Sequence, residues 1–243
     1  MITFNNVNMR FQDTVVMDNF SEEFEDSKVN CILGPSGCGK TTLLNLLSGI
    51  LKEDSGHIAK PERISYVFQD DSLIPQKTAR KNLELVLKSV YKSKAELRDI
   101  VDKYLLISDL DKASHLYPHE MSGGMRQRLA LIRAFAYPSD ALLMDEPFKA
   151  LDMTLKSSII DSFLSLYEQT KRTVIFVTHD IDDALMVGDY IYIYSDKPLS
   201  LLKKLTILES KNSRKLYSDG LLRIKNKFYE EIGTKQSSGS PFC

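Results

Sequence analysis

Gly34-Pro-Ser-Gly-Cys-Gly-Lys40-Thr41 matches the pattern G-x4-G-K-[ST] at every fixed position. The apolar run Val29–Leu33 comes directly before it, and residues 41–51 follow with leucines at helical spacing. Glycines let the backbone wrap closely around a polyphosphate, and the N-terminus of the following helix adds positive potential. This order of strand, loop and helix predicts a phosphate-binding loop. The alternative is a glycine-rich turn with a chance lysine.

Two side chains of the loop are suited to bind nucleotide and metal. Lys40 is expected to reach the terminal phosphates, and the hydroxyl of Thr41 to bind Mg²⁺. The residues predicted to contact nucleotide in this segment are Gly34, Pro35, Ser36, Gly37, Cys38, Gly39, Lys40, Thr41 and Thr42.

A second acidic site follows the apolar run at residues 141–144, which ends in Asp145 and Glu146. Asp145 is suited to the Mg²⁺ shell, and Glu146 is suited to polarising an attacking water. The alternative is that both acids begin a solvated loop. Together with the phosphate-binding loop, they predict a site for nucleotide hydrolysis.

The rest of the chain alternates between strand and helix patterns. Residues 1–25 predict short alternating strands, and buried strands are predicted near 64–68, 174–177 and 191–194. Between about 78 and 116 the apolar residues follow a helical period, which predicts an inserted helical lobe. Buried strands that alternate with helices favour an α/β fold with a parallel sheet covered on both faces.

Composition excludes several classes of protein. The 243 residues carry 32 Lys and Arg against 33 Asp and Glu, so a chain-wide polybasic nucleic-acid binder is excluded. No run of about 18 apolar residues exists, and no basic stretch followed by an apolar one begins the sequence, so we expect neither a membrane span nor a signal peptide. Cys31, Cys38 and Cys243 stand in unrelated contexts, which indicates a reducing compartment rather than a disulfide framework.

The stretch Met121-Ser-Gly-Gly-Met125-Arg-Gln-Arg128 resembles the LSGGQ signature of ABC ATPases. Walker A, Q-loop, signature, Walker B, D-loop and H-loop elements occur in the ABC order between Gly34 and His179, and the flanking strands extend the resemblance over most of the chain. The pairing of SGGMRQR with DEPF-x-ALD is similar to the importer ATPases of the nitrate/sulfonate/taurine group.

This resemblance implies a P-loop NTPase core of the ABC type with an antiparallel β subdomain and an inserted helical subdomain. The expected ATP-binding domain covers residues 1–208, with the helical subdomain at about 78–135, and a short helical tail covers 209–243. The tail pattern of Tyr217, Leu221, Ile224 and Phe228 predicts one amphipathic helix.

The resemblance also implies a head-to-tail dimer with two ATP molecules between the subunits. Ser122, Gly123 and Gly124 of one copy would contact the γ-phosphate held by the Walker A loop of the other. These residues open a helix, so free N–H groups and the helix dipole can face the phosphate. The alternative is a helix cap made by Ser122, and the same geometry allows both roles.

Four further residues take roles from the resemblance. Gln69 is the Q-loop glutamine, which contacts Mg²⁺ or the attacking water, and His179 is the H-loop histidine, which holds the γ-phosphate and Glu146 in geometry. Asp152 belongs to the D-loop at the dimer interface, and Phe11 stacks on adenine. Each has a structural alternative: Gln69 as a polar residue after a strand, His179 as a structural histidine, Asp152 as a helix cap, and Phe11 as a core residue.

Beyond ATP and Mg²⁺, the resemblance implies transmembrane permease subunits, an indirect link to an extracytoplasmic substrate-binding protein, and no nucleic acid. The expected location is cytoplasmic, on the inner face of the cell membrane. The sequence does not identify the transported nutrient, and Met125, Lys149 and Gln76 depart from the family pattern. The rival functions are a non-transport ABC ATPase and a nonhydrolytic nucleotide switch.

Overall fold

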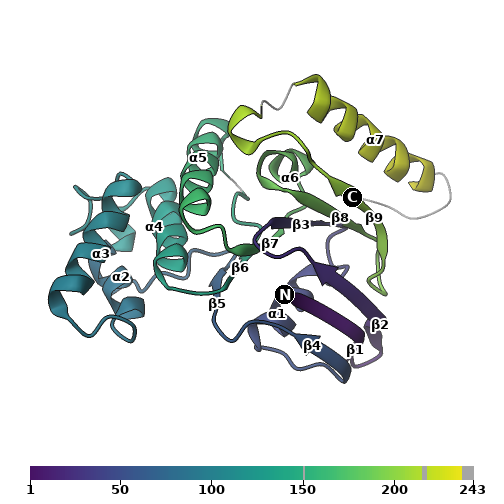
Figure 1. Ribbon diagram of the computed structural model, residues 1–243, viewed down its shortest axis with the longest axis horizontal. Coiled ribbons are helices and arrows are strands. Elements are labelled where there is room, and N and C mark those ends of the chain that lie inside the picture. The colour runs from purple at the N-terminus through teal and green to yellow at the C-terminus, as the bar shows by residue number, and fades with distance from the viewer. Residues whose placement is uncertain (150, 215–217, 237–243) are drawn as a thin grey trace. The chain divides into compact units, whose positions relative to one another are not determined.

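The computed structural model describes residues 1–149, 151–214 and 218–236 (Figure 1). It contains two compact units. The first is formed by residues 1–61 and the described residues from 173 onward, and the second by residues 62–172. No helix of the described residues is both long enough and apolar enough to span a bilayer.

The first unit contains an antiparallel three-stranded sheet (Figure 1). Its strands are β1 (Ile2–Phe11), β2 (Thr14–Phe24) and β4 (Ser55–Ala59), in the order β2-β1-β4. The ring of Phe4 makes edge-to-face contacts with Phe20 and Phe24, and all three are buried. The short strands predicted for residues 1–25 are thus two long paired strands, which this aromatic core holds in register.

The same unit holds a mostly parallel sheet segment. Its strands are β3 (Val29–Leu33), β7 (Thr173–Val177), β8 (Tyr190–Tyr194) and β9 (Leu201–Thr206), in the order β7-β3-β8-β9. β3 runs parallel to β7 and β8, and β3 and β7 are buried throughout, as their apolar runs predict.

The sequence pattern predicted no strand at residues 201–206, where β9 runs antiparallel to β8. Exposed and half-buried residues alternate along β9, and Lys203 and Lys204 lie in it. A charged strand of this kind is suited to a sheet edge, where it discourages further pairing.

The helices of the first unit are α1 (Lys40–Ser48), α6 (Ile181–Val187) and α7 (Asp219–Gln236), with a 3-10 turn at Lys211–Ser213. Helix α1 ends earlier than its leucine spacing predicts, because Gly49 adopts the left-handed conformation that caps it. Ile50 therefore lies outside the helix and is exposed.

Helix α7 agrees with the predicted amphipathic tail helix where the two can be compared. Leu221 and Phe228 are buried, whereas Tyr217 lies outside the described residues. The ammonium of Lys225 binds both carboxylate oxygens of Asp182 on α6, at 2.6 and 2.8 Å. The buried guanidinium of Arg214 donates to the carbonyl oxygens of Leu185 and Gly188 at 3.0 and 2.6 Å, so it caps the end of α6.

The second unit joins two parallel strands to a group of helices (Figure 1). The strands are β5 (Ile64–Val67) and β6 (Ala141–Asp145). The helices are α2 (Ala79–Leu87), α3 (Lys94–Ile107), α4 (Gly123–Ala136) and α5 (Met153–Thr170), with a 3-10 turn at Pro118–Glu120. The helical period predicted around α3 is confirmed, since Val101, Tyr104 and Leu105 are buried. The division at 78–135 and 209 stays a prediction.

Candidate nucleotide site

The predicted phosphate-binding loop lies between β3 and α1. Cys38 donates its N–H to the carbonyl oxygen of Pro35 at 3.3 Å, which folds the loop into a turn. Gly37 and Gly39 have φ angles of 82° and 119°, which favour glycine. A Cβ atom on Gly39 would lie 2.6 Å from Cγ1 of Val16, so this position also has no room for a side chain.

Lys40 places its ammonium inside this loop. Its Nζ donates to the carbonyl oxygens of Gly34 and Pro35 at 2.8 and 2.7 Å, and the residue is only 6% exposed. Gly39, at the N-cap of α1, has no side chain with which to cap the first turn. A buried cation beside the N-terminus of a helix favours an anionic ligand.

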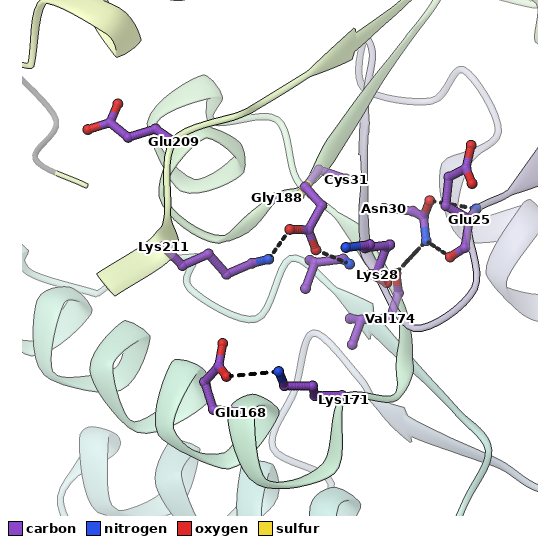
Figure 2. A network of polar contacts seen from close by, with 12 residues as sticks. Glu25, Lys28, Asn30, Cys31, Glu168, Lys171, Val174, Gly188, Glu209 and Lys211 are labelled. Atoms are coloured by element: carbon purple, nitrogen blue, oxygen red, sulfur yellow. Dashed lines mark hydrogen bonds and ion pairs between the residues drawn. The ribbon is translucent and has the colours of Figure 1, made fainter. Parts of the chain in front are cut away.

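The start of β3 is fixed by polar contacts shown in Figure 2. The side-chain amide of Asn30 donates to the carbonyl oxygens of Glu25 and Lys28 at 2.9 and 3.2 Å. Asp189 accepts from the N–H of Val29 at 2.8 Å and from the ammonium of Lys211. These bonds hold the strand that leads into the phosphate-binding loop.

His179 lies at the same edge of the sheet as this loop. Ile32 on β3 pairs with Val177 on the parallel strand β7, and the N–H of Thr178 donates to the carbonyl oxygen of Ile32 at 3.2 Å. His179 follows at once and is exposed. The structure therefore brings the predicted loop and the predicted H-loop histidine to the carboxyl ends of adjacent strands, where α/β folds bind ligands.

Phe11 ends β1, where it pairs with Thr14. Its side chain is 43% exposed, so the alternative that it fills the core was wrong. An exposed aromatic ring is available for stacking, and its contact with adenine stays a prediction.

In the second unit the parallel strands β5 and β6 bring three candidates to one edge. Val67 pairs with Met144, so the exposed Gln69 follows β5 at the edge where Asp145 ends β6 and Glu146 comes next. Asp145 is buried, which argues against the alternative of a fully solvated loop. Burial, together with the charge of Asp145, raises the pKa of Tyr66.

Glu146 has a backbone conformation that is uncommon for its residue type, with φ at 45°. Its carbonyl oxygen accepts from the N–H of Lys149 at 3.1 Å, which closes a turn. The ammonium of Lys149 lies 2.5 Å from Oε2 of Glu146. Sequence reasoning noted Lys149 only as a departure, although its spacing of three residues from Glu146 was a readable signal.

The signature segment forms the first turn of α4. Ser122 is its N-cap and accepts from the N–H of Met125 at 3.3 Å, so the cap is confirmed. Ser122 and Gly123 are exposed. A Cβ atom on Gly124 would lie 2.3 Å from Cδ1 of Leu155 on α5, which explains the small residue there. An exposed cap with free N–H groups is compatible with the predicted phosphate contact.

The signature helix is tied to the loop after Gln69, which sequence reasoning missed. Arg126 on α4 forms an ion pair with Asp71 at 2.9 Å, and Arg133 donates to the carbonyl oxygens of Asp71 and Ser72 at 3.1 and 2.8 Å.

Asp152 caps α5 through the N–H of Leu155 at 2.9 Å, so its alternative as a cap is confirmed. Its D-loop role stays a prediction.

Comparisons with known proteins agree with these features. A family model described as ABC transporter matches residues 17–149. The nitrate import ATP-binding protein NrtD of Synechococcus elongatus is 36% identical over 199 residues, covering 77% of this chain and 72% of that protein. The aliphatic sulfonates import ATP-binding protein SsuB of Bacillus cereus strain ZK / E33L is 38% identical over 212 residues, covering 82% of each.

Solved structures share the fold. The dimeric structure of MJ0796, a bacterial ABC transporter cassette, has a TM-score of 0.75 and 28% identity, covering 86% of this chain and 100% of that one. A second structure of that cassette, in a post-hydrolysis state bound to ADP and Pi, has a TM-score of 0.73. The predicted α/β fold of the ABC ATPase type is confirmed. The chain belongs to the ABC transporter family of ATP-binding cassettes.

Proposed function

We propose that the chain is the ATP-hydrolysing subunit of an importer and acts with separate transmembrane permease subunits on the inner face of the cell membrane. The observation that carries the proposal is the buried ammonium of Lys40 inside the loop between β3 and α1. The import functions named for the nitrate and sulfonate relatives support the transport role. We infer a small nutrient of the nitrate, sulfonate or taurine kind as cargo.

The residues divide the work of hydrolysis as follows. Lys40 and the N–H groups of the loop hold the phosphates, and Phe11 stacks on the adenine. Glu146 accepts a proton from the attacking water, and His179 holds the γ-phosphate. Ser122, Gly123 and Gly124 of a second copy donate to that phosphate, and Asp152 lies at the interface between copies.

Mg²⁺ is the metal implied by this chemistry. Across the described ranges there is no cluster of three or more His, Cys, Asp or Glu side chains suited to a protein cage. Mg²⁺ commonly takes one or two protein oxygens and completes its shell with water and substrate phosphates. The hydroxyl of Thr41, the carboxylate of Asp145 and the amide oxygen of Gln69 are suited to it, and Mg²⁺ would neutralise charge that develops on the phosphates.

Phosphate release from Mg·ATP tests the enzymatic part of the proposal. The wild-type protein should release phosphate, and Glu146→Gln, which keeps the shape but cannot accept the proton, should be slower by at least about 100-fold. Equal rates for the two proteins, with permease present, would favour the nonhydrolytic switch.

The transport part has its own test. Affinity purification of the tagged chain from its native membranes should recover permease subunits with it. Recovery with ribosomes or nucleic acid, and without membrane protein, would favour the non-transport ABC ATPase.

A further inference from the structure

Lys149 forms an ion pair with Glu146, the residue proposed above to accept the proton from water. Its ammonium lies 2.5 Å from Oε2 of Glu146. The Glu146 side chain is 12% exposed, whereas that of Lys149 is 44% exposed. At this distance the ammonium and the carboxylate form an ion pair. A water molecule cannot bond to that oxygen from the same direction while the lysine is there.

A backbone turn holds Lys149 close to Glu146. Glu146 and Lys149 are the ends of one turn, closed by the bond from the N–H of Lys149 to the carbonyl oxygen of Glu146 at 3.1 Å. Pro147 restricts the turn through its ring, and its carbonyl oxygen accepts from the side-chain amide of Gln127 on α4 at 2.5 Å. The lysine stem therefore starts from a fixed point beside Glu146.

Phe148 anchors the same turn from the other side. It is 1% exposed, and its ring meets that of Phe163 on α5 edge-on, with centroids 6.5 Å apart. With one residue packed in the core and another bonded to α4, the turn stays in place when the lysine head moves. Rotation of the half-exposed Lys149 side chain is then enough to move the ammonium away from Oε2 of Glu146.

We propose that Lys149 is a positioning residue that latches Glu146 and slows hydrolysis by the isolated chain until its ammonium swings away. This inference rests on the proposed function, because it assigns Lys149 an effect on the proton acceptor. The ammonium and the attacking water compete for one carboxylate oxygen. A part-exposed ion pair of this kind changes an equilibrium by up to about fivefold, which sets the size of the effect.

The test is steady-state phosphate release from Mg·ATP by the purified full chain. Lys149→Met removes the charge and keeps the stem, and kcat should rise about two- to fivefold with KM unchanged. Lys149→Arg keeps a cation that can pair with Glu146, so it should restore the wild-type rate. Lys149→Ser should give the same rise in kcat. It serves as the second variant if Lys149→Met lowers the melting temperature.

Lys81→Met is the matched control. Lys81 also pairs with a glutamate three residues away, at 2.9 Å from Glu84, on helix α2. Its loss should leave kcat and KM unchanged. A change of the same size in this control would show that the effect comes from general surface charge. It would contradict the proposal that Lys149 slows hydrolysis through Glu146.

A double-mutant cycle tests whether the effect of Lys149→Met on kcat acts through Glu146. In the Glu146→Gln background, Lys149→Met should give no gain, because the carboxylate it restrains is gone. A gain there, or an unchanged or lower kcat for Lys149→Met alone, overturns the inference. Neither outcome contradicts the proposed function if the wild-type protein still releases phosphate faster than Glu146→Gln. The proposed ATP hydrolysis itself is contradicted if the two proteins have equal rates with permease present.

Discussion

The ammonium of Lys40 lies 2.8 Å from the carbonyl oxygen of Gly34, six residues earlier in the chain. A second bond, to the carbonyl oxygen of Pro35 at 2.7 Å, completes the contact. The lysine thus points back into the loop that it follows. Two carbonyl dipoles are weaker partners for a buried cation than a phosphate anion would be, so the loop is prepared to exchange them for a ligand.

Lys40→Ala should weaken ATP binding by about 100-fold or more, because truncating one partner of a buried charge pair costs about 2–5 kcal/mol. Isothermal titration calorimetry on the Glu146→Gln background measures the affinity without turnover. Lys60→Ala is the control, since Lys60 also donates to a backbone carbonyl, that of Leu46 at 2.8 Å. An unchanged ATP affinity in Lys40→Ala would contradict the assigned site.

The two glycines with left-handed backbone in this loop should differ when each is replaced by alanine. Gly37→Ala should cost about 1–2 kcal/mol of unfolding free energy, because only the backbone is strained and nothing lies within 4 Å of the added Cβ atom. Gly39→Ala should cost roughly 2–4 kcal/mol, because its Cβ atom also meets Val16. Urea unfolding measures both, and equal costs would show that the contact with Val16 relaxes freely.

Ser122 offers a way to separate its cap from its proposed phosphate contact. Ser122→Asp keeps a good capping group, so the melting temperature should not change. The added negative charge would face the γ-phosphate held by the second copy, so ATP hydrolysis should fall at least about tenfold. Ser93→Asp at the N-cap of α3 is the matched control. Wild-type hydrolysis by Ser122→Asp would mean that the segment only caps the helix.

Cys31 should make the protein less stable in alkaline solution. Burial raises the pKa of the Cys31 thiol far above its ordinary value. Its contribution to stability is therefore complete below the unfolded pKa of about 8.5 and is lost above it, at up to about 1.4 kcal/mol per pH unit. Urea unfolding from pH 7.5 to 9.5 should show this fall, and Cys31→Ala should show a shallower one. If unfolding free energy fell equally steeply with pH in both proteins, the fall could not be assigned to Cys31.

Local sequence predicted much of the fold and of the site. The phosphate-binding loop needs glycines and a lysine at fixed spacing between β3 and α1, so adjacent residues carry its whole signal. The apolar runs of β3, β6 and β7 are buried on both faces, and such runs are readable without knowledge of their neighbours.

Contacts between distant segments were harder to predict. The ion pair between Arg126 and Asp71 joins residues 55 positions apart, and no local pattern specifies it. The edge strand β9 carries charges and alternates only weakly, so its pairing with β8 decides its structure. The ion pair between Lys149 and Glu146 occurs in a turn where Glu146 has a left-handed backbone, which its residue type does not favour.

Sedimentation velocity of Glu146→Gln with and without Mg·ATP tests the central claim most directly, since this variant should bind ATP without consuming it. We expect a monomer without nucleotide, a dimer with Mg·ATP, and no dimer at any ATP concentration when Ser122→Asp is added. A sedimentation coefficient that ATP leaves unchanged, in protein shown by calorimetry to bind it, would contradict the claim that a second copy closes over the nucleotide.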